Sequence, residues 1–296
     1  MSKLWRFGFF TFGGLQFWCD RLVYHNWRIQ ENYWSKKCRL LDPHNIRRAR
    51  GSYNDCFETL EKVKEIWELK RPSGHLVVLV HGLGRSCNMF NKMKKQLKNS
   101  GYNVVAISYP STRYNLSEHV DNLENLLNNL DGIESISFVA HSLGNIIIRA
   151  AMAKRSKWRS NIKVKRFVQI APPNNGSVLA EKVRNWGIVR AFYGDVLDDL
   201  IPEKVKELPT PDCEFGIIAG GNGTEKGMCP IFFKSDNDMI VKVEETRISG
   251  YSDFFVVDAL HSFMPSYTNV IAATELFLSS GRFSKGKQIK KELNFL

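Results

Sequence analysis

Residues 136–149 read ISFVAHSLGNIIIR, and this stretch decides the fold. Its apolar start predicts a buried strand, and residues 145–155 predict a helix. Between them the pentapeptide AHSLG stands where a G-x-S-x-G motif forms a tight strand-to-helix turn, with Ala140 in place of the first glycine. Such a pentapeptide also arises by chance, and its serine would then only cap the helix. The strand before it and the helix after it favour Ser142 as a nucleophile.

Short β-branched runs alternate with helical patterns from Gly74 onward. This alternation predicts an α/β fold with a mostly parallel central sheet and helices on both of its faces. Strands are expected at 75–80, 104–108, 136–140, 166–171, 215–219 and 254–257, and helices at 88–98, 117–130, 145–155 and 268–278. An insertion at 172–210 carries amphipathic patterns at 178–186 and 189–200, which predict either a small helical cap over the site or a pair of packed helices.

A glycine-rich turn, HGLG at 81–84, follows the first expected strand of this sheet. Pre-oriented backbone amides stabilise the negative charge that develops on a tetrahedral oxygen during acyl transfer. The N–H groups of Leu83 and Leu143 are the expected donors of such an oxyanion hole, because these loops meet at the serine in this kind of fold. Without Ser142 the same residues would indicate an ordinary turn. His81 is expected to be structural and not a base.

A serine hydroxyl is a weak nucleophile at neutral pH, so a histidine must accept its proton and a carboxylate must orient that histidine. His261 is the only histidine after Ser142, and it stands between the last expected strand and the last expected helix. The acid should lie between them in the chain. Asp238 and Asp236 share one turn, and Asp238 is favoured because it precedes a loop that returns to the sheet. The other would be a solvated turn residue.

Residues 1–70 are expected to form an N-terminal extension, and residues 71–296 the main domain. The extension begins with aromatic residues from Trp5 to Trp18, flanked by cations, in an apolar run too short to span a membrane. No small-residue cleavage site follows, so secretion is not expected. The aromatic cluster either lies in a membrane interface or packs on the protein body. A stripe of apolar residues predicts an amphipathic helix at 53–70, so the extension is expected to be helical.

Forty-two Lys and Arg against thirty Asp and Glu give a net charge of +12, which would favour a polyanionic partner such as an anionic membrane. The basic residues are scattered and form no nucleic-acid motif, so nucleic acid is not expected, and a solvated basic surface is the alternative. The six cysteines form no C-x-x-C pair and no zinc spacing, so free thiols, no metal and no cofactor are expected. The expected location is the cytoplasm, or the inner face of the membrane if the N-terminus binds there.

Several segments, in this order, resemble the bacterial esterase and lipase family of the α/β-hydrolases over most of the chain from about Leu76 to Phe283. They are HGLGRS (81–86), GYNVVAISYPST (101–112), FVAHSLGN (138–145), IAPPNNGS (170–177), NDMIVKVEET (237–246) and HSFM (261–264). Family members carry D-G-x-V at the acid loop, so the resemblance through Val241 selects Asp238 as the acid. Met239 stands where that pattern has glycine.

The resemblance implies a serine carboxylester hydrolase that works through a Ser142, Asp238 and His261 triad and an acyl-enzyme. Its substrate would be a lipid, a thioester or a small ester. Two alternatives keep the same fold. The triad could act as an acyltransferase or thioesterase, or the chain could be a non-catalytic, membrane-associated module, because a fold alone does not fix a function.

Overall fold

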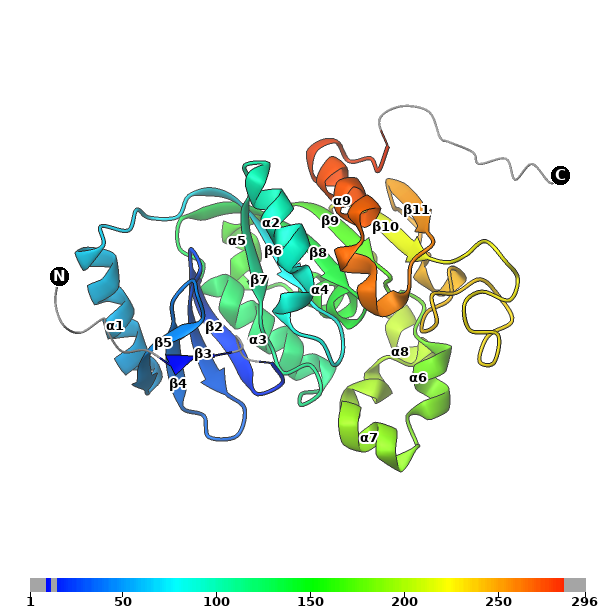
Figure 1. Cartoon of the computed structure of the whole chain (residues 1–296), viewed down its shortest axis with the longest axis horizontal. Coiled ribbons are helices and arrows are strands. Elements are labelled where there is room, and N and C mark those ends of the chain that lie inside the picture. Colours follow the sequence, from blue (N-terminus) through cyan, green and yellow to red (C-terminus); the bar gives the residue numbers. More distant parts are fainter. Residues whose placement is uncertain (1–8, 12–14, 285–296) are drawn as a thin grey trace.

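The computed structural model describes residues 9–11 and 15–284, which form two β-sheets with helices packed around the larger one (Figure 1). The larger sheet has the strand order β11-β10-β9-β8-β6-β7, and all neighbouring strands are parallel. Its strands are β6 (Gly74–Val80), β7 (Asn103–Ile107), β8 (Ile133–His141), β9 (Lys163–Ile170), β10 (Glu214–Gly220) and β11 (Asp253–Val257). The predicted α/β fold with a parallel sheet is confirmed.

Helices cover both faces of this sheet. They are α2 (Asn91–Asn99), α3 (Leu116–Asn128), α4 (Leu143–Ala153), α5 (Lys157–Asn161) and α9 (Thr268–Ser280), with short 3-10 turns η2 (Cys87–Phe90), η4 (Glu244–Thr246) and η5 (His261–Ser266). Alternate residues of β6 face opposite sides, as a strand requires. Leu76, Val78 and Val80 pack in one core with residues of α3 and α4. Val77 and Leu79 pack in another with residues of α2 and α9.

The N-terminal extension forms a five-stranded antiparallel sheet followed by one helix. Its elements are β1 (Phe9–Phe10), β2 (Trp18–Tyr24), β3 (Trp27–Asn32), β4 (Cys38–Leu41), β5 (Ile46–Gly51) and α1 (Tyr53–Ile66). The expected helical extension is therefore helical only in α1. The strands are hard to recognise in the sequence because the buried polar side chains of Asp20, Gln30 and Arg39 interrupt the apolar pattern.

The small sheet is joined to the large one by a buried hydrogen-bond network around Asp20. Its backbone N–H donates to Ser108 O at 2.9 Å, and Ser108 N donates back to Asp20 Oδ2 at 2.7 Å. Gln30 Nε2 donates to Asp20 Oδ1 at 2.7 Å. Leu22 and Tyr24 on the same strand are buried. Strand β2 therefore packs on the body of the protein, whereas the aromatic residues at positions 5, 7 and 12 of the expected interfacial cluster lie outside the described residues.

The insertion after β9 forms four short helical segments, which together are called the cap. They are α6 (Val178–Val183), α7 (Gly187–Tyr193), η3 (Asp195–Asp199) and α8 (Pro202–Lys206). Of the two helices expected at 178–186 and 189–200, the first ends early, at Val183, and the second is divided into α7 and η3 at Gly194, which adopts a positive φ of 70°. None of the described helices is long and apolar enough to cross a membrane.

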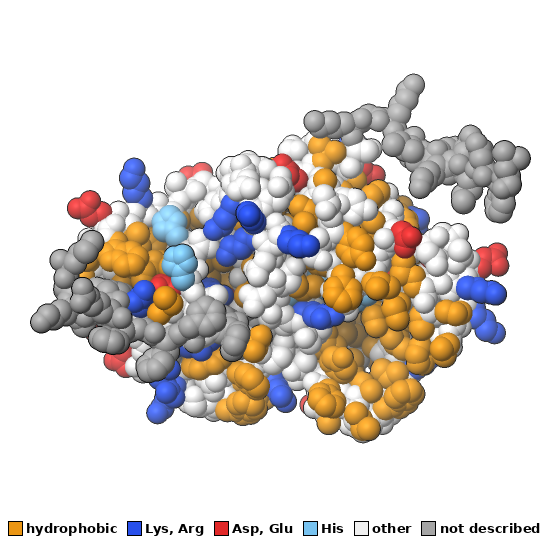
Figure 2. Space-filling view, in the orientation of Figure 1, with side chains coloured by type: hydrophobic (Ala, Val, Ile, Leu, Met, Phe, Trp, Pro, Cys, Tyr) orange, Lys and Arg blue, Asp and Glu red, His pale blue; other side chains and the backbone are white. Residues whose placement is uncertain are grey.

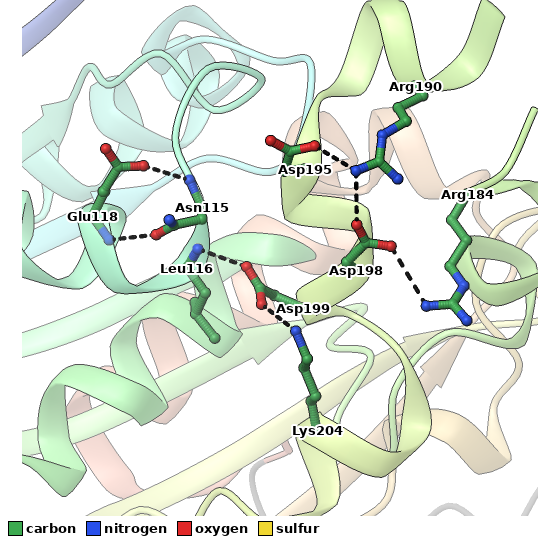
Figure 3. A network of polar contacts seen from close by, with 9 residues as sticks. All are labelled: Asn115, Leu116, Glu118, Arg184, Arg190, Asp195, Asp198, Asp199 and Lys204. Carbon is green, nitrogen blue, oxygen red and sulfur yellow. Dashed lines mark hydrogen bonds and ion pairs between the residues drawn. The ribbon is translucent and has the colours of Figure 1, made fainter. Parts of the chain in front are cut away.

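Ion pairs join the parts of the cap to one another, and one hydrogen bond joins the cap to the start of α3 (Figure 3). Asp199 Oδ2 accepts a hydrogen bond from Leu116 N, at the start of α3, with a distance of 2.9 Å. The other oxygen of Asp199 accepts from Lys204 Nζ at 2.9 Å. Within the cap, Arg190 lies 2.7 Å from Asp195. The aspartates of η3 therefore hold the cap helices together and place them beside α3.

Candidate active site

Ser142 lies in the turn between β8 and α4, at the carboxyl edge of the parallel sheet. Its φ of 50° and ψ of −121° form a strained backbone conformation that L-residues rarely adopt. The backbone N–H of Ser142 donates to Ile170 O at 3.0 Å, which ties the turn to the end of β9. The Ser142 side chain is half-buried. A strained serine held between a strand and a helix is the geometry of a nucleophile elbow.

Gly144 explains why this turn needs a residue without a side chain. A Cβ atom added there would lie 2.6 Å from Val80 O and 2.8 Å from His81 O. Both contacts involve backbone atoms at the end of β6, which cannot move away cheaply. The first turn of α4 therefore packs directly against the end of β6. Ala140, which replaces the usual first glycine, is fully buried and is accommodated within β8.

Asp238 and His261 lie close together. His261 Nδ1 donates to Asp238 Oδ2 at 2.7 Å, and both side chains are buried. The other carboxylate oxygen, Oδ1, accepts from Ile240 N at 3.1 Å and from Val241 N at 2.8 Å. The backbone N–H of His261 also donates to Asp238 O at 3.0 Å. The carboxylate is thus held by its own loop and presents one oxygen to the imidazole.

Asp236, the alternative acid, makes other contacts. Its Oδ1 accepts from Asn222 N at 2.9 Å, and its Oδ2 accepts from Gly223 N at 3.0 Å. These bonds fix the loop that follows β10. Asp238 therefore contacts the histidine, whereas Asp236 stabilises a turn.

Met239 stands where the resemblance leads one to expect glycine, and its φ is 86°. This left-handed conformation is costly for a residue with a side chain. It is held in place because Asp238 accepts hydrogen bonds from the two amides that follow Met239. The turn geometry of a glycine-containing acid loop is therefore kept without the glycine, and the Met239 side chain is partly exposed.

His141, immediately before Ser142, contacts His261, and the sequence pattern does not reveal this contact. Its Nε2 donates to His261 O at 2.9 Å, and the two rings lie 4.7 Å apart between centroids. Burial, followed by the nearby His261, holds the pKa of His141 well below 6.5, so the ring stays neutral. The residue before the serine therefore fixes the backbone of the histidine that follows β11. Position x of the A-x-S-x-G motif is the only sequence signal of this role.

The two expected oxyanion donors are Leu143, directly after the serine, and Leu83, in the loop after β6. Leu143 is the first residue of α4, so its N–H has no acceptor within the helix. Leu83 follows β6, in the loop that begins with Gly82. A Cβ atom added at Gly82 would lie 3.0 Å from Ser142 Cβ, which shows how closely this loop passes the serine. The loop that carries Leu83 therefore passes close to the serine turn.

His81 is fully buried and stacks on the Tyr109 ring, with centroids 4.1 Å apart. Its Nδ1 donates to Gly82 O at 2.9 Å, and Tyr109 donates its hydroxyl hydrogen to His81 O. Burial lowers the pKa of His81 to about 4, so the ring is neutral at physiological pH. These contacts give His81 the structural part expected of it.

A cleft of about 570 Å³ opens beside residues 84–86 and η5. Its walls include Leu15 and Gln16 from the N-terminal extension, Gly84, Arg85, Ser86 and Met89 from the loop and η2, and Ser262, Phe263 and Pro265 from η5. This volume is in the range of small-molecule sites. The N-terminal extension thus forms one wall of the cleft. The sequence, which only suggested an extension at 1–70 and a main domain at 71–296, does not predict this contact.

Comparisons with known proteins give one family match over part of the chain and several similar solved structures. Residues 70–193 match a family model described as "Putative serine esterase (DUF676)". No curated protein sequence matches the chain. The structure is similar to the mature lipase BlEst2 of Bacillus licheniformis, at 18% identity and a TM-score of 0.56, over 72% of this chain and 92% of the lipase.

A second similar structure is the metagenomic carboxyl esterase MGS0156, at 20% identity and a TM-score of 0.54, over 64% of this chain and 65% of the esterase. At such low identity the likeness establishes the fold. The family model covers less than half of the chain, and the matched segment contains Ser142. The α/β-hydrolase fold that the sequence motifs indicated is confirmed, and part of the chain matches the putative serine esterase model.

Proposed function

We propose that this chain hydrolyses carboxylic esters, with Ser142 as nucleophile, His261 as general base and Asp238 as the acid that orients His261. The observation that carries the proposal is the 2.7 Å hydrogen bond from His261 Nδ1 to Asp238 Oδ2. It fixes the proton on Nδ1 and leaves Nε2 free to accept a proton from a serine. His141 links this pair to the elbow, because it adjoins Ser142 in the chain and bonds to the His261 carbonyl.

The reaction follows from these positions. Ser142 Oγ attacks the ester carbonyl carbon while His261 Nε2 takes the hydroxyl proton, and the carbonyl electrons move to the oxygen. The Leu83 and Leu143 amides stabilise that oxyanion. When it collapses, the bond to the alcohol oxygen breaks and His261 returns the proton to the leaving alcohol. Water then repeats the sequence on the acyl-enzyme and releases the carboxylic acid and free Ser142.

The surface around the site supports an apolar acyl group or a lipid as substrate. Trp186, just before α7, and Ile188 and Phe192, on α7, are between 55% and 78% exposed, and Phe263 on η5 is 56% exposed. Figure 2 shows hydrophobic side chains gathered on the face that carries the cap. Exposed apolar groups in this number are uncommon on a protein surface without a ligand or partner. The cap adjoins the site, because a Cβ atom added at Gly84 would lie 3.2 Å from the Tyr193 ring.

The test is a panel of esters from short to long acyl chains, with the Ser142→Ala variant and a serine-directed fluorophosphonate. We expect the wild-type chain to hydrolyse members of the panel and to be labelled only when folded. Ser142→Ala should keep the fold and lose both activities, because only the nucleophilic hydroxyl is removed. Turnover and labelling retained in Ser142→Ala would refute the proposal. Equal labelling of native and denatured wild-type chain, without turnover, would favour the non-catalytic alternative.

We further propose that the residues before Leu15 give the protein a peripheral affinity for anionic membranes. The sequence there combines Trp5 and Phe7 with Lys3 and Arg6, and each cation adds about 1 kcal/mol near an anionic surface. Deleting residues 2–8 should abolish co-sedimentation with phosphatidylserine vesicles at low salt and leave turnover on a soluble ester unchanged. Failure of the intact chain to co-sediment at low salt would refute this proposal.

A further inference from the structure

Residues 81–86, between β6 and η2, contain Leu83 and are called the oxyanion loop after the role proposed for that amide. Gln16, in the N-terminal extension, is bonded to this loop through both ends of its side-chain amide. Its Nε2 donates to Arg85 O at 2.5 Å. Its Oε1 accepts from Ser111 Oγ at 3.1 Å, and from Thr112 N and Oγ1 at 3.1 and 3.2 Å. Ser111 Oγ in turn accepts from Gly84 N at 3.0 Å. One side chain is therefore bonded, directly or through one hydroxyl, to two consecutive residues of the loop.

The loop needs such support because its own sequence gives it little rigidity. Gly82 and Gly84 enclose Leu83, and Gly84 has a positive φ of 66°. Glycine has the largest backbone freedom of any residue, so a loop with two glycines gains order from its contacts. Packing against the serine turn fixes the Gly82 end. The Gly84 and Arg85 end is fixed by the bonds to Ser111 and Gln16.

Gln16 is itself firmly placed. The next residue, Phe17, accepts a backbone hydrogen bond from Tyr33 N at 2.8 Å, which joins it to the turn after β3. Four residues later in the chain, Asp20 is bonded to Ser108 in both directions. Ser108 begins the segment that follows β7, and Ser111, three residues later, is fully buried. Asp20 and Gln16 therefore both bind the segment that follows β7, at Ser108 and at Ser111. Gln16 also binds the oxyanion loop.

We propose that Gln16 is a positioning residue of the active site, which holds the Leu83 amide in the orientation that stabilises the oxyanion. The inference rests on the proposed ester hydrolysis. Because the oxyanion forms only during reaction, loosening the loop should lower kcat and leave KM nearly unchanged. Removal of an oxyanion donor costs about 10²–10³-fold in kcat, so a donor that is only loosened should cost about 10-fold.

The experiment compares wild type with Gln16→Met, which keeps the side-chain length and removes every hydrogen bond of the amide. Gln96→Met is the matched control, because Gln96 is exposed on α2 and its amide bonds only to Glu275 among the described contacts. We expect Gln16→Met to lower kcat about 10-fold with KM within about twofold. The affinity for an alkyl boronate, which forms a tetrahedral adduct on the serine, should fall by the same factor. Gln96→Met should match wild type in both.

Amide hydrogen exchange measures the loop without any substrate. Exchange at Gly84 and Arg85 should be faster in Gln16→Met than in wild type or in the control. A variant that melts at a lower temperature but keeps its kcat, its boronate affinity and its loop exchange would overturn the inference, since Gln16 would then only hold the extension. If the wild-type chain has no esterase activity, the proposed function is refuted. Faster loop exchange in Gln16→Met would then still show that Gln16 orders the loop.

Discussion

Replacing Asp238 with asparagine tests the acid assignment sharply, because the structure decides how the new amide must lie. The Oδ1 atom of Asp238 accepts from Ile240 N at 3.1 Å and Val241 N at 2.8 Å. An NH₂ group in that position would face two donors, so the asparagine carbonyl must stay there. Its NH₂ group then points at His261 Nδ1, which has to become an acceptor. The proton moves to Nε2, and the imidazole can no longer take the proton of Ser142.

The expected magnitude follows from this tautomer change. An imidazole with its proton on the wrong nitrogen costs on the order of 10⁴ in kcat in serine hydrolases, which corresponds to about 5.5 kcal/mol of transition-state free energy. The fold should survive, since the side-chain volume and the two backbone hydrogen bonds are kept. The free energy of unfolding is expected to fall by about 1–3 kcal/mol, because a charge-assisted hydrogen bond is weakened.

The assay is steady-state hydrolysis of a soluble ester by wild type, Asp238→Asn and Asp236→Asn, with circular dichroism to confirm folding. Asp236→Asn is the matched control, because Asp236 bonds to Asn222 and Gly223 and not to the histidine. Its kcat should stay within about twofold of wild type, as expected for a residue outside the reacting groups. A large loss in Asp236→Asn together with a small one in Asp238→Asn would refute the reasoning and exchange the two roles.

Three further changes probe the turns and the buried core. Gly144→Ala should destabilise the protein by about 1–3 kcal/mol and lower kcat, because the new Cβ would lie 2.6 Å from Val80 O. An unchanged melt would contradict the close packing of the elbow. Met239→Gly should stabilise by about 0.5–1 kcal/mol, since glycine relieves the positive φ at some cost in chain entropy. A lower midpoint in urea unfolding would show that the methionine side chain contributes more than the strain removes. Burial lowers the pKa of His119 from 6.5 to about 3, so its neutral form contributes stability above pH 6.5 that is lost as pH falls towards 3. In His119→Phe, the slope of unfolding free energy against pH in this window should be smaller than in wild type by up to about 1.36 kcal/mol per pH unit. The same slope in both proteins would rule out this histidine as a cause.

The parallel sheet could be predicted because its signals are local. A buried strand such as β8 is a continuous apolar run, and α4 follows it with a helical pattern. The turn at Ser142 also has a local signal, the AHSLG pentapeptide between a strand pattern and a helix pattern, although the atoms that require Gly144 belong to Val80 and His81. Short-range patterns of this kind survive in the sequence whatever the rest of the chain does.

The antiparallel sheet of the extension could not be predicted in the same way. Gln30 is fully buried in β3 and is satisfied by Asp20 and Arg39, which also lie on strands of that sheet. Each of these residues looks exposed when read alone, because a polar side chain is buried only where a partner completes its hydrogen bonds. The partners come from different strands, so the sequence around any one of them does not reveal the arrangement.

Local sequence patterns were enough to predict the fold class, the position of Ser142 in its turn and the single histidine that follows it, and they favoured Asp238 over Asp236. The folded structure was needed to show that Asp238 meets His261, that His141 binds the backbone of His261, and that Gln16 reaches the loop at Arg85. The last two pairs are separated by 120 and 69 residues in the chain. Contacts over such distances depend on how the loops are placed by the packed sheets, and a hydrogen bond forms only when donor and acceptor meet within a few tenths of an ångström. Local propensity carries no information at that precision.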